Sequence, residues 1–370
     1  MMYKAITWSL VMLLVACNVK TVNKKKHVTP YVFYRDSGTE VINVKAQYDV
    51  EGANDKENIR ITFQGRPQQN FTVHLRENLM HPPTKYKASE KLLAIADIEG
   101  QFDALRNLLL NAKVIDKHYN WIFGDGHLVL LGDFMDRGEL VMECLWLIYS
   151  LEEKAKQAGG YVHFILGNHE LMNLSGDTRY VHPKYFLDAM AMKKRYVDLF
   201  DSNTELGRWL RTKNVIEQIG DLLFVHGGIA PEINQLGEDL EQINTIARPY
   251  YANAMQRSYK DPLVNVIVQY KTAPFWYRGY YDRKEPLPNA VIDNTLKKFQ
   301  VKHVITGHTV VADTISTWYD GKIINIDTRH SAGKSEALLM EGNKYFRINT
   351  KGQRREIKVL SSRKKLESIK

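Results

Sequence analysis

The sequence predicts an α/β fold, on three observations. Five short apolar runs end abruptly in glycine and polar residues, which is typical of buried strands. Segments between the first runs repeat their apolar residues at helical spacing, so strands alternate with helices. Asp, Asn or His also stands at the end of every run, where a strand scaffold would gather these side chains into one rigid site. The runs are residues 92–96, 128–131, 162–166, 222–225 and 303–306.

The chain begins with an apolar run, residues 5–16, that ends at Cys17. A run of about twelve residues is too short to span a bilayer and has the dimensions of a signal-peptide core. Leu14-Val15-Ala16-Cys17 resembles the lipobox of bacterial lipoproteins, in which cleavage leaves the cysteine as a lipidated N-terminus. We therefore expect a signal peptide at 1–17 and a tether at 18–30. The lipid on Cys17 would anchor the protein to a membrane of the bacterial cell envelope, facing the periplasm or the exterior. An uncleaved anchor or a plain secretory signal is the alternative.

The net charge of +9 is concentrated at the two ends of the chain. Four lysines follow the N-terminal apolar run, and residues 351–370 carry eight basic and two acidic side chains. The remainder is close to neutral, so a basic groove for nucleic acid is not implied, and no nucleic-acid partner is expected.

Composition shifts along the chain divide it into regions. Short β-prone pieces separated by turn residues predict a small β-rich accessory region over 31–80, followed by a linker at 81–83. We expect the catalytic domain at 88–348 and a basic tail at 349–370. The β-prone pieces are residues 31–34, 41–44, 59–63 and 71–75.

Helices are predicted from the spacing of apolar residues. Residues 101–114 and 139–156 each present one apolar face. Residues 184–210 are helical and two-faced, and form an insertion between the third and fourth strands. Residues 249–281 are rich in tyrosine and irregular.

The strand ends supply oxygen and imidazole donors. Carboxylate, amide and imidazole ligands suit Mn, Fe, Zn or Mg, and a chain with two cysteines excludes a thiolate site. Each donor has a structural alternative: Asp97 as the cap of the following helix, His226 as a partnered core histidine, and the Gly307-His308 pair as a turn.

Four motifs identify a family resemblance. Gly132-Asp-Phe-Met-Asp-Arg-Gly138 and Gly167-Asn-His-Glu170 are followed in order by His226-Gly-Gly and Gly307-His. This set resembles the calcineurin-like metallophosphoesterases, and within them the phosphoprotein-phosphatase branch. With Trp-Tyr-Arg-Gly at 276–279, the layout resembles the Shewanella-like phosphatases over residues 91–345. The resemblance implies a β-sandwich flanked by helices, with the site on loops at one edge.

The resemblance also implies a centre of two divalent metal ions. Manganese is expected, with Fe, Zn or Mg as alternatives. Asp133 would bridge the ions, Asp97 would bind the first, and Asn168, His226 and His308 would bind the second. A hydroxide shared by the ions would attack phosphorus, because the cations lower the pKa of bound water.

Four further residues match catalytic positions of the family. His169 would protonate the leaving oxygen, and Asp136 would orient its imidazole. Arg137 would hold phosphate oxygens through its bidentate guanidinium. Arg278, from a looser local match, is the expected second phosphate-binding arginine.

One position departs from the family. The first motif normally reads Asp-x-His-Gly, but this chain has Asp97-Ile98-Glu99-Gly100. As a metal ligand, Glu99 would replace a neutral imidazole with a carboxylate and favour harder ions such as Mn or Mg over Zn.

The sequence therefore predicts a metal-dependent phosphatase that hydrolyses phosphate monoesters of a protein, at phosphotyrosine or phosphoserine, or of a small molecule. Two alternatives stay open. One is hydrolysis of dinucleoside polyphosphates or other phosphoanhydrides. The other is a catalytically impaired binding lipoprotein in which Glu99 has spoiled the first metal site. The sequence does not define an oligomeric state.

Overall fold

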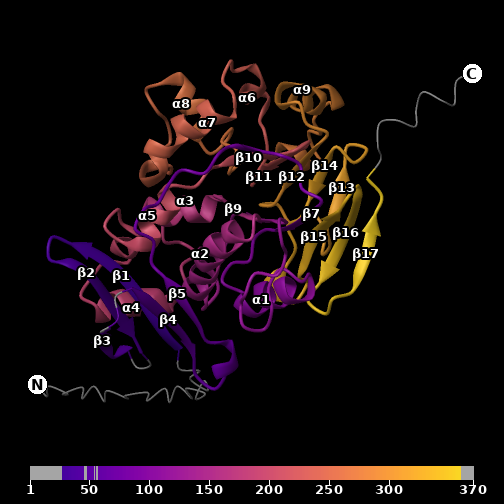
Figure 1. The fold of residues 1–370 in the computed structure, drawn as a ribbon. Coiled ribbons are helices and arrows are strands. Elements are labelled where there is room, and N and C mark those ends of the chain that lie inside the picture. Colours follow the sequence, from indigo (N-terminus) through magenta and orange to yellow (C-terminus); the bar gives the residue numbers. More distant parts are fainter. Residues whose placement is uncertain (1–26, 46–47, 54, 56, 360–370) are drawn as a thin grey trace, which may run out of the picture.

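The computed structural model describes residues 27–45, 48–53, 55 and 57–359 (Figure 1). The expected signal peptide, lipobox and most of the tether lie outside the described residues, as do residues 360–370 at the end of the basic tail. Within the described part, no helix is both long and apolar enough to cross a bilayer.

Two six-stranded sheets form the centre of the molecule, with strand orders β17-β16-β15-β7-β8-β9 and β13-β14-β12-β11-β10-β6. The strands β7, β8 and β9 run parallel, and so do β11, β12 and β14. Their bounds are β6 (Lys85–Tyr86), β7 (Lys91–Ile95), β8 (His127–Leu131), β9 (Tyr161–Ile165), β10 (Ile216–Ile219), β11 (Leu222–Val225), β12 (His303–Thr306), β13 (Ser316–Trp318), β14 (Ile323–Asn325), β15 (Glu336–Glu341), β16 (Lys344–Asn349) and β17 (Arg354–Ile357).

The sheets pack face to face, which explains the unbroken apolar runs. In β7, Leu92 and Ala94 join a core with Phe224 and Ile305 of the other sheet, whereas Leu93 packs with the helices on the outer face. Because both faces of the central strands are covered, apolar residues occupy successive positions instead of alternating with polar ones.

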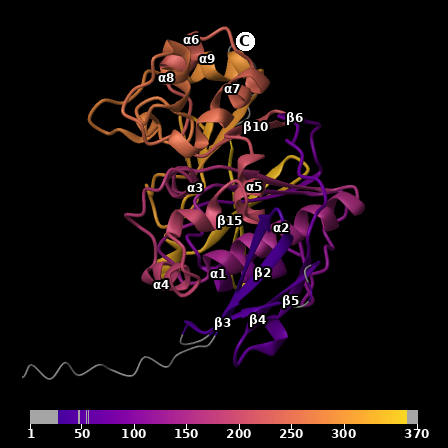
Figure 2. The same cartoon turned by 90° about the vertical axis from the view of Figure 1, so that its left-hand side faces the viewer.

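Helices cover the outer faces of the sandwich, with α2 packed against β9 and α7 against β10. Figures 1 and 2 show α6 to α9 gathered at one end of the molecule. The helices are α1 (Phe102–Asn111), α2 (Val141–Gln157), α3 (Asn168–Leu174), α4 (Pro183–Ala191), α5 (Glu205–Arg211), α6 (Pro231–Gln235), α7 (Leu240–Ala247), α8 (Pro262–Val268) and α9 (Asn289–Phe299).

The β-prone N-terminal segment forms a third sheet, of order β3-β2-β1-β4-β5, at the other end of the molecule from α6 to α9 (Figure 2). Tyr31 and Phe33 of β1 are buried in the same apolar core as the helices, and the indole N–H of Trp146 in α2 donates to the carbonyl of Pro30 at 3.2 Å. The strands are β1 (His27–Arg35), β2 (Gly38–Val44), β3 (Val50–Gly52), β4 (Asn58–Phe63) and β5 (Phe71–His74).

Two segments differ from expectation. Residues 184–210 are not one continuous helix but α4, a 3-10 turn (Tyr196–Phe200) and α5. The break follows from Lys193, whose φ of 56° ends α4, and from Thr204, whose hydroxyl caps α5 by accepting from the Gly207 N–H. The sheet also extends beyond residue 348, because β17 pairs with β16 inside the segment expected to be a tail.

Candidate active site

The predicted donor residues meet at one edge of the sandwich. Asp97, Asp133 and Asn168 follow β7, β8 and β9, while His226 and His308 follow β11 and β12, and all five are buried. Parallel strands bring their carboxyl ends to the same side of the sheet. Backbone hydrogen bonds hold together the loops that follow these strands. The Asp97 N–H donates to the Gly132 carbonyl at 3.0 Å.

Backbone strain is concentrated at this edge. Of the thirteen described non-glycine residues with positive φ, six are predicted site residues. Left-handed backbone costs a residue with a β-carbon of the order of 1–3 kcal/mol, and it persists only where the surroundings enforce it. The six are Asp97, Glu99, Asp133, Asp136, Arg137 and His308.

Glu170 enforces part of this geometry. Its buried carboxylate accepts the backbone N–H groups of Gly167, Asp133, Phe134 and Met135 at 2.8–3.1 Å. It thereby fixes the loop after β8 against the start of α3. The sequence pattern gives Glu170 as the last residue of the Gly-Asn-His-Glu motif but does not indicate this structural role. Its position directly after Asn168 and His169 was the available signal.

Asp133, His226 and His308 form a group of metal-binding type, with one donor atom from each lying within 4.8 Å of the others. Nδ1 of His226 lies 2.7 Å from the Leu131 carbonyl, to which it donates, so Nε2 is the nitrogen that faces the group. That Nε2 is 3.1 Å from Asp133 Oδ2 and 3.2 Å from the amide oxygen of Asn168. This donor set fits a divalent metal ion.

The electrostatics of the group suit ligands. Burial opposes ionisation of Asp133, but the imidazoles of His226 and His169 outweigh it and hold the pKa of that carboxyl well below its usual range. Burial, with the charges of His226 and Arg278, lowers the pKa of His308 well below its ordinary value. A carboxylate and a neutral imidazole are the forms that bind metal.

The two acids of the first motif differ in their surroundings. Asp97 accepts the His308 backbone N–H with its two oxygens at 3.2 and 3.0 Å, and burial with the charges of Asp327 and Asp133 raises the pKa of Asp97. Glu99 instead forms an ion pair with Arg137. Asp97 and Glu99 are both outside the gathered metal-binding group, so the ligand role of each stays a prediction.

His169 is arranged as an acid. Its Nδ1 donates to Asp136 Oδ2 at 2.6 Å, and Asp136 also accepts from the amide of Asn173 at 2.9 Å. Burial alone would lower the pKa of His169, but the charges of Asp133 and Asp136 raise it above its ordinary value. The imidazolium form is therefore favoured.

Both predicted arginines line a cleft of about 900 Å³ that also reaches His169 and Asn168. The guanidinium of Arg278 donates to the His308 carbonyl at 2.7 Å and to the Thr309 hydroxyl at 3.1 Å. Arg137 lies 5.1 Å from the ring centre of Tyr180, another residue of the cleft wall.

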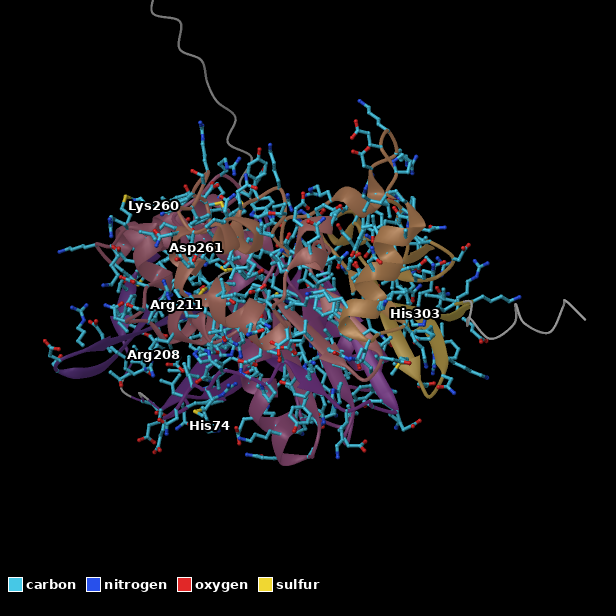
Figure 3. All side chains as sticks on the ribbon, turned by 90° about the horizontal axis from the view of Figure 1, so that it is seen from above. His74, Arg208, Arg211, Lys260, Asp261 and His303 are labelled. Atoms are coloured by element: carbon cyan, nitrogen blue, oxygen red, sulfur yellow. The ribbon has the colours of Figure 1, made fainter. Side chains whose placement is uncertain are left out.

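Not every histidine that follows or lies in a strand belongs to the site. His303, labelled in Figure 3, stands at the first position of β12, the opposite end of that strand from His308. Its Nδ1 lies 2.8 Å from the carbonyl of Gly321, a structural hydrogen bond.

The sequence missed Asp327, which lies two residues beyond β14 and is buried beside the site. A weaker signal was present, because residues 323–326, Ile-Ile-Asn-Ile, are mostly apolar and end at an aspartate.

Comparison with known proteins defines the class. The calcineurin-like phosphoesterase profile matches residues 90–312, and the chain belongs to this family. It is a metal-dependent phosphatase with a metallophosphoesterase fold.

Individual relatives show which members of this family the chain is similar to. Shewanella-like protein phosphatase 2 of Arabidopsis thaliana is 26% identical over 302 residues, covering 69% of this chain and 75% of that protein. Shewanella-like protein phosphatase 1 of Plasmodium berghei is 28% identical over 232 residues, covering 60% and 62%. The crystal structure of a cold-active protein-tyrosine phosphatase of a psychrophile Shewanella species superposes with a TM-score of 0.81. It is 33% identical and covers 89% of this chain and 98% of that one.

Proposed function

We propose that this phosphatase acts on phosphorylated side chains of proteins, with phosphotyrosine among its substrates. The observation that carries the proposal is the cleft at the catalytic edge. It places the aromatic rings of Tyr180 and Trp276 beside His169 and the two arginines. An aryl phosphate entering this cleft would present its phosphate to the arginines and its ring to the aromatic wall. The Shewanella tyrosine phosphatase, with 33% identity, supports the same substrate class.

The roles of the side chains follow from their positions. Arg137 and Arg278 would hold the phosphoryl oxygens through charge-assisted hydrogen bonds. His169, held by Asp136, would donate its proton from Nε2 to the departing oxygen. Two divalent ions, for which we propose manganese, would supply Lewis-acid polarisation and an activated water. Asp97, Asp133, Asn168, His226 and His308 would hold them.

A second candidate is hydrolysis of dinucleoside polyphosphates. A symmetrical bis(5'-nucleosyl)-tetraphosphatase of Glaesserella parasuis is 31% identical over 142 residues. That match covers 37% of this chain and 44% of that protein.

We also propose export and lipid anchoring at Cys17, from the lipobox-like sequence. Replacing Cys17 with serine should abolish incorporation of labelled palmitate and release the protein from the membrane fraction. Equal labelling of parent and Cys17→Ser would reject the anchor.

The substrate class is tested with manganese-loaded protein and three substrates at equal concentration: a phosphotyrosine peptide, a phosphoserine peptide and diadenosine tetraphosphate. We expect kcat/KM to be highest for the phosphotyrosine peptide. A higher value for diadenosine tetraphosphate would reject the protein-phosphatase proposal in favour of the second candidate. Binding of metal without turnover of any of the three would also reject it.

A further inference from the structure

Asp327 is a buried acid without a partner. Its exposed fraction is 3%, yet within the described residues its carboxylate accepts no hydrogen bond and has no basic group within 4.0 Å. The other acids at this edge are satisfied: Asp97 accepts the His308 N–H, Asp136 accepts from His169, and Glu170 accepts four backbone groups. A buried carboxylate without donors is costly, and the charges of His226, Arg278 and Arg137 only partly offset the rise in its pKa that burial causes, so the position favours a further cation.

The sheet places Asp327 at the first-metal side of the site. In the parallel pairing of β12 with β14, Thr306 lies opposite Asn325, and the Ile326 N–H donates to the Thr306 carbonyl at 2.8 Å. Asp327 therefore stands level with the Gly307-His308 turn, whose backbone binds Asp97. The charge of Asp327 is also the largest electrostatic contribution to the raised pKa of Asp97, after burial itself. The two carboxylates are therefore close enough for their charges to interact.

The first metal has no imidazole donor at the position where the family has histidine. Glu99 occupies that position, but its carboxylate is ion-paired with Arg137. Asp97 and the bridging Asp133 alone would leave a divalent ion short of protein ligands.

We propose that Asp327 is an additional oxygen ligand of the first metal, replacing the imidazole of the usual family motif. The centre is then asymmetric. Its first site is all-oxygen, from Asp97, Asp133 and Asp327, and its second contains the imidazoles of His226 and His308. An all-oxygen site favours Mn²⁺ or Mg²⁺ over Zn²⁺, so Zn²⁺ would fill the second site preferentially. The inference rests on the metal-dependent function but not on the identity of the substrate.

The test compares Asp327→Asn with Asp320→Asn. Asp320 is exposed, carries the same charge and lies at the other end of β14, which makes it a matched control. Mn²⁺ binding to the metal-stripped full chain is measured by calorimetry, and the melting temperature is measured with and without Mn²⁺. We expect Asp327→Asn to weaken one of two Mn²⁺ sites by roughly 100-fold or more, since even residues behind the ligands are worth 10–100-fold. The other site should be retained.

The metal-free melting temperature separates a ligand from a structural residue. An amide in place of an unpartnered buried carboxylate removes a charge-burial cost, so metal-free Asp327→Asn should melt above the parent while gaining less from Mn²⁺. Asp320→Asn should match the parent in both measurements.

Two results would overturn the inference. One is parental affinity for both ions in Asp327→Asn. The other is loss of one ion in Glu99→Gln with both kept in Asp327→Asn, which would assign the position to Glu99. A parent that binds two Mn²⁺ ions but cleaves no phosphorylated peptide would reject the proposed substrate class and leave this inference standing.

Discussion

Two clusters of buried histidine and carboxylate side chains join the sheets of the sandwich, and they differ in what their polar atoms face. At the catalytic edge, His226, His308 and Asp133 converge on one small volume. Among β8, β9 and β10, away from the carboxyl ends of β8 and β9, Nδ1 of His163 lies 2.7 Å from Glu217 Oε2, and its Nε2 lies 2.9 Å from His127 Nδ1. We call this second set, His127, His163 and Glu217, the distal cluster.

The distal cluster is saturated by its own members and neighbours. Both ring nitrogens of His163 are used, and the second oxygen of Glu217 accepts from the amide of Asn214 at 2.8 Å. At the catalytic edge, by contrast, three donor atoms converge on one small volume, and the carboxylate of Asp327 accepts no hydrogen bond within the described residues. Similar buried residues therefore contribute to stability where they pair with one another and can bind metal where their donor atoms converge.

The catalytic and distal clusters should differ most in how a variant that removes a charge affects phosphatase turnover. Asp133→Asn should lower phosphatase turnover by at least about 10³-fold, because it removes the carboxylate that holds the metals and their electrostatic contribution. The experiment measures metal content by mass spectrometry and kcat with p-nitrophenyl phosphate as substrate. Near-normal turnover with two bound metals would contradict the ligand assignment.

His169→Ala should lose roughly 10²–10⁴-fold in turnover, the scale of a missing general acid, while metal content is kept. The loss should be smaller for aryl phosphates, whose leaving groups need little protonation. Side-by-side kinetics on an aryl and an alkyl phosphate check this. Equal losses on both would indicate that His169 positions the metals instead.

In the distal cluster, Glu217→Gln should destabilise the fold by about 1–3 kcal/mol, the cost of disrupting a buried hydrogen-bonded group, with kcat of the folded protein unchanged. Urea unfolding and turnover at saturating substrate measure the two quantities. A fall in kcat without loss of stability would erase the distinction between the clusters.

The smallest effect concerns pH. Burial and the charge of His163 lower the pKa of His127 to about 4. The unfolded chain, in which the histidine pKa is about 6.5, therefore takes up the proton first as pH falls. The stability that neutral His127 contributes is present above pH 6.5 and is lost progressively down to pH 4. His127→Gln should show a shallower fall in melting temperature over this window. Parallel curves for parent and variant would argue against a buried neutral His127.

The sequence pattern predicted five of the twelve strands in the two sheets, β7, β8, β9, β11 and β12, because buried strands are apolar on both faces and end at glycine and polar residues. The β-sandwich was expected from the family resemblance, and the other seven strands were not predicted. The same local pattern located Asp133, Asn168, His226 and His308, which the structure brings together as expected. The helical insertion at 184–210 was expected to be continuous, because apolar spacing does not reveal a left-handed residue such as Lys193.

Which residues stand at the strand ends could be predicted, since that depends on short-range patterns of apolar, glycine and polar residues. Which other side chains each of them contacts depends on the tertiary structure. Glu99 pairs with Arg137 from another strand loop, and Asp327 reaches the neighbourhood of Asp97 through the register of β12 with β14. These interactions join residues that are far apart in the chain. They are fixed by strand order and by burial, and a local pattern does not encode either one.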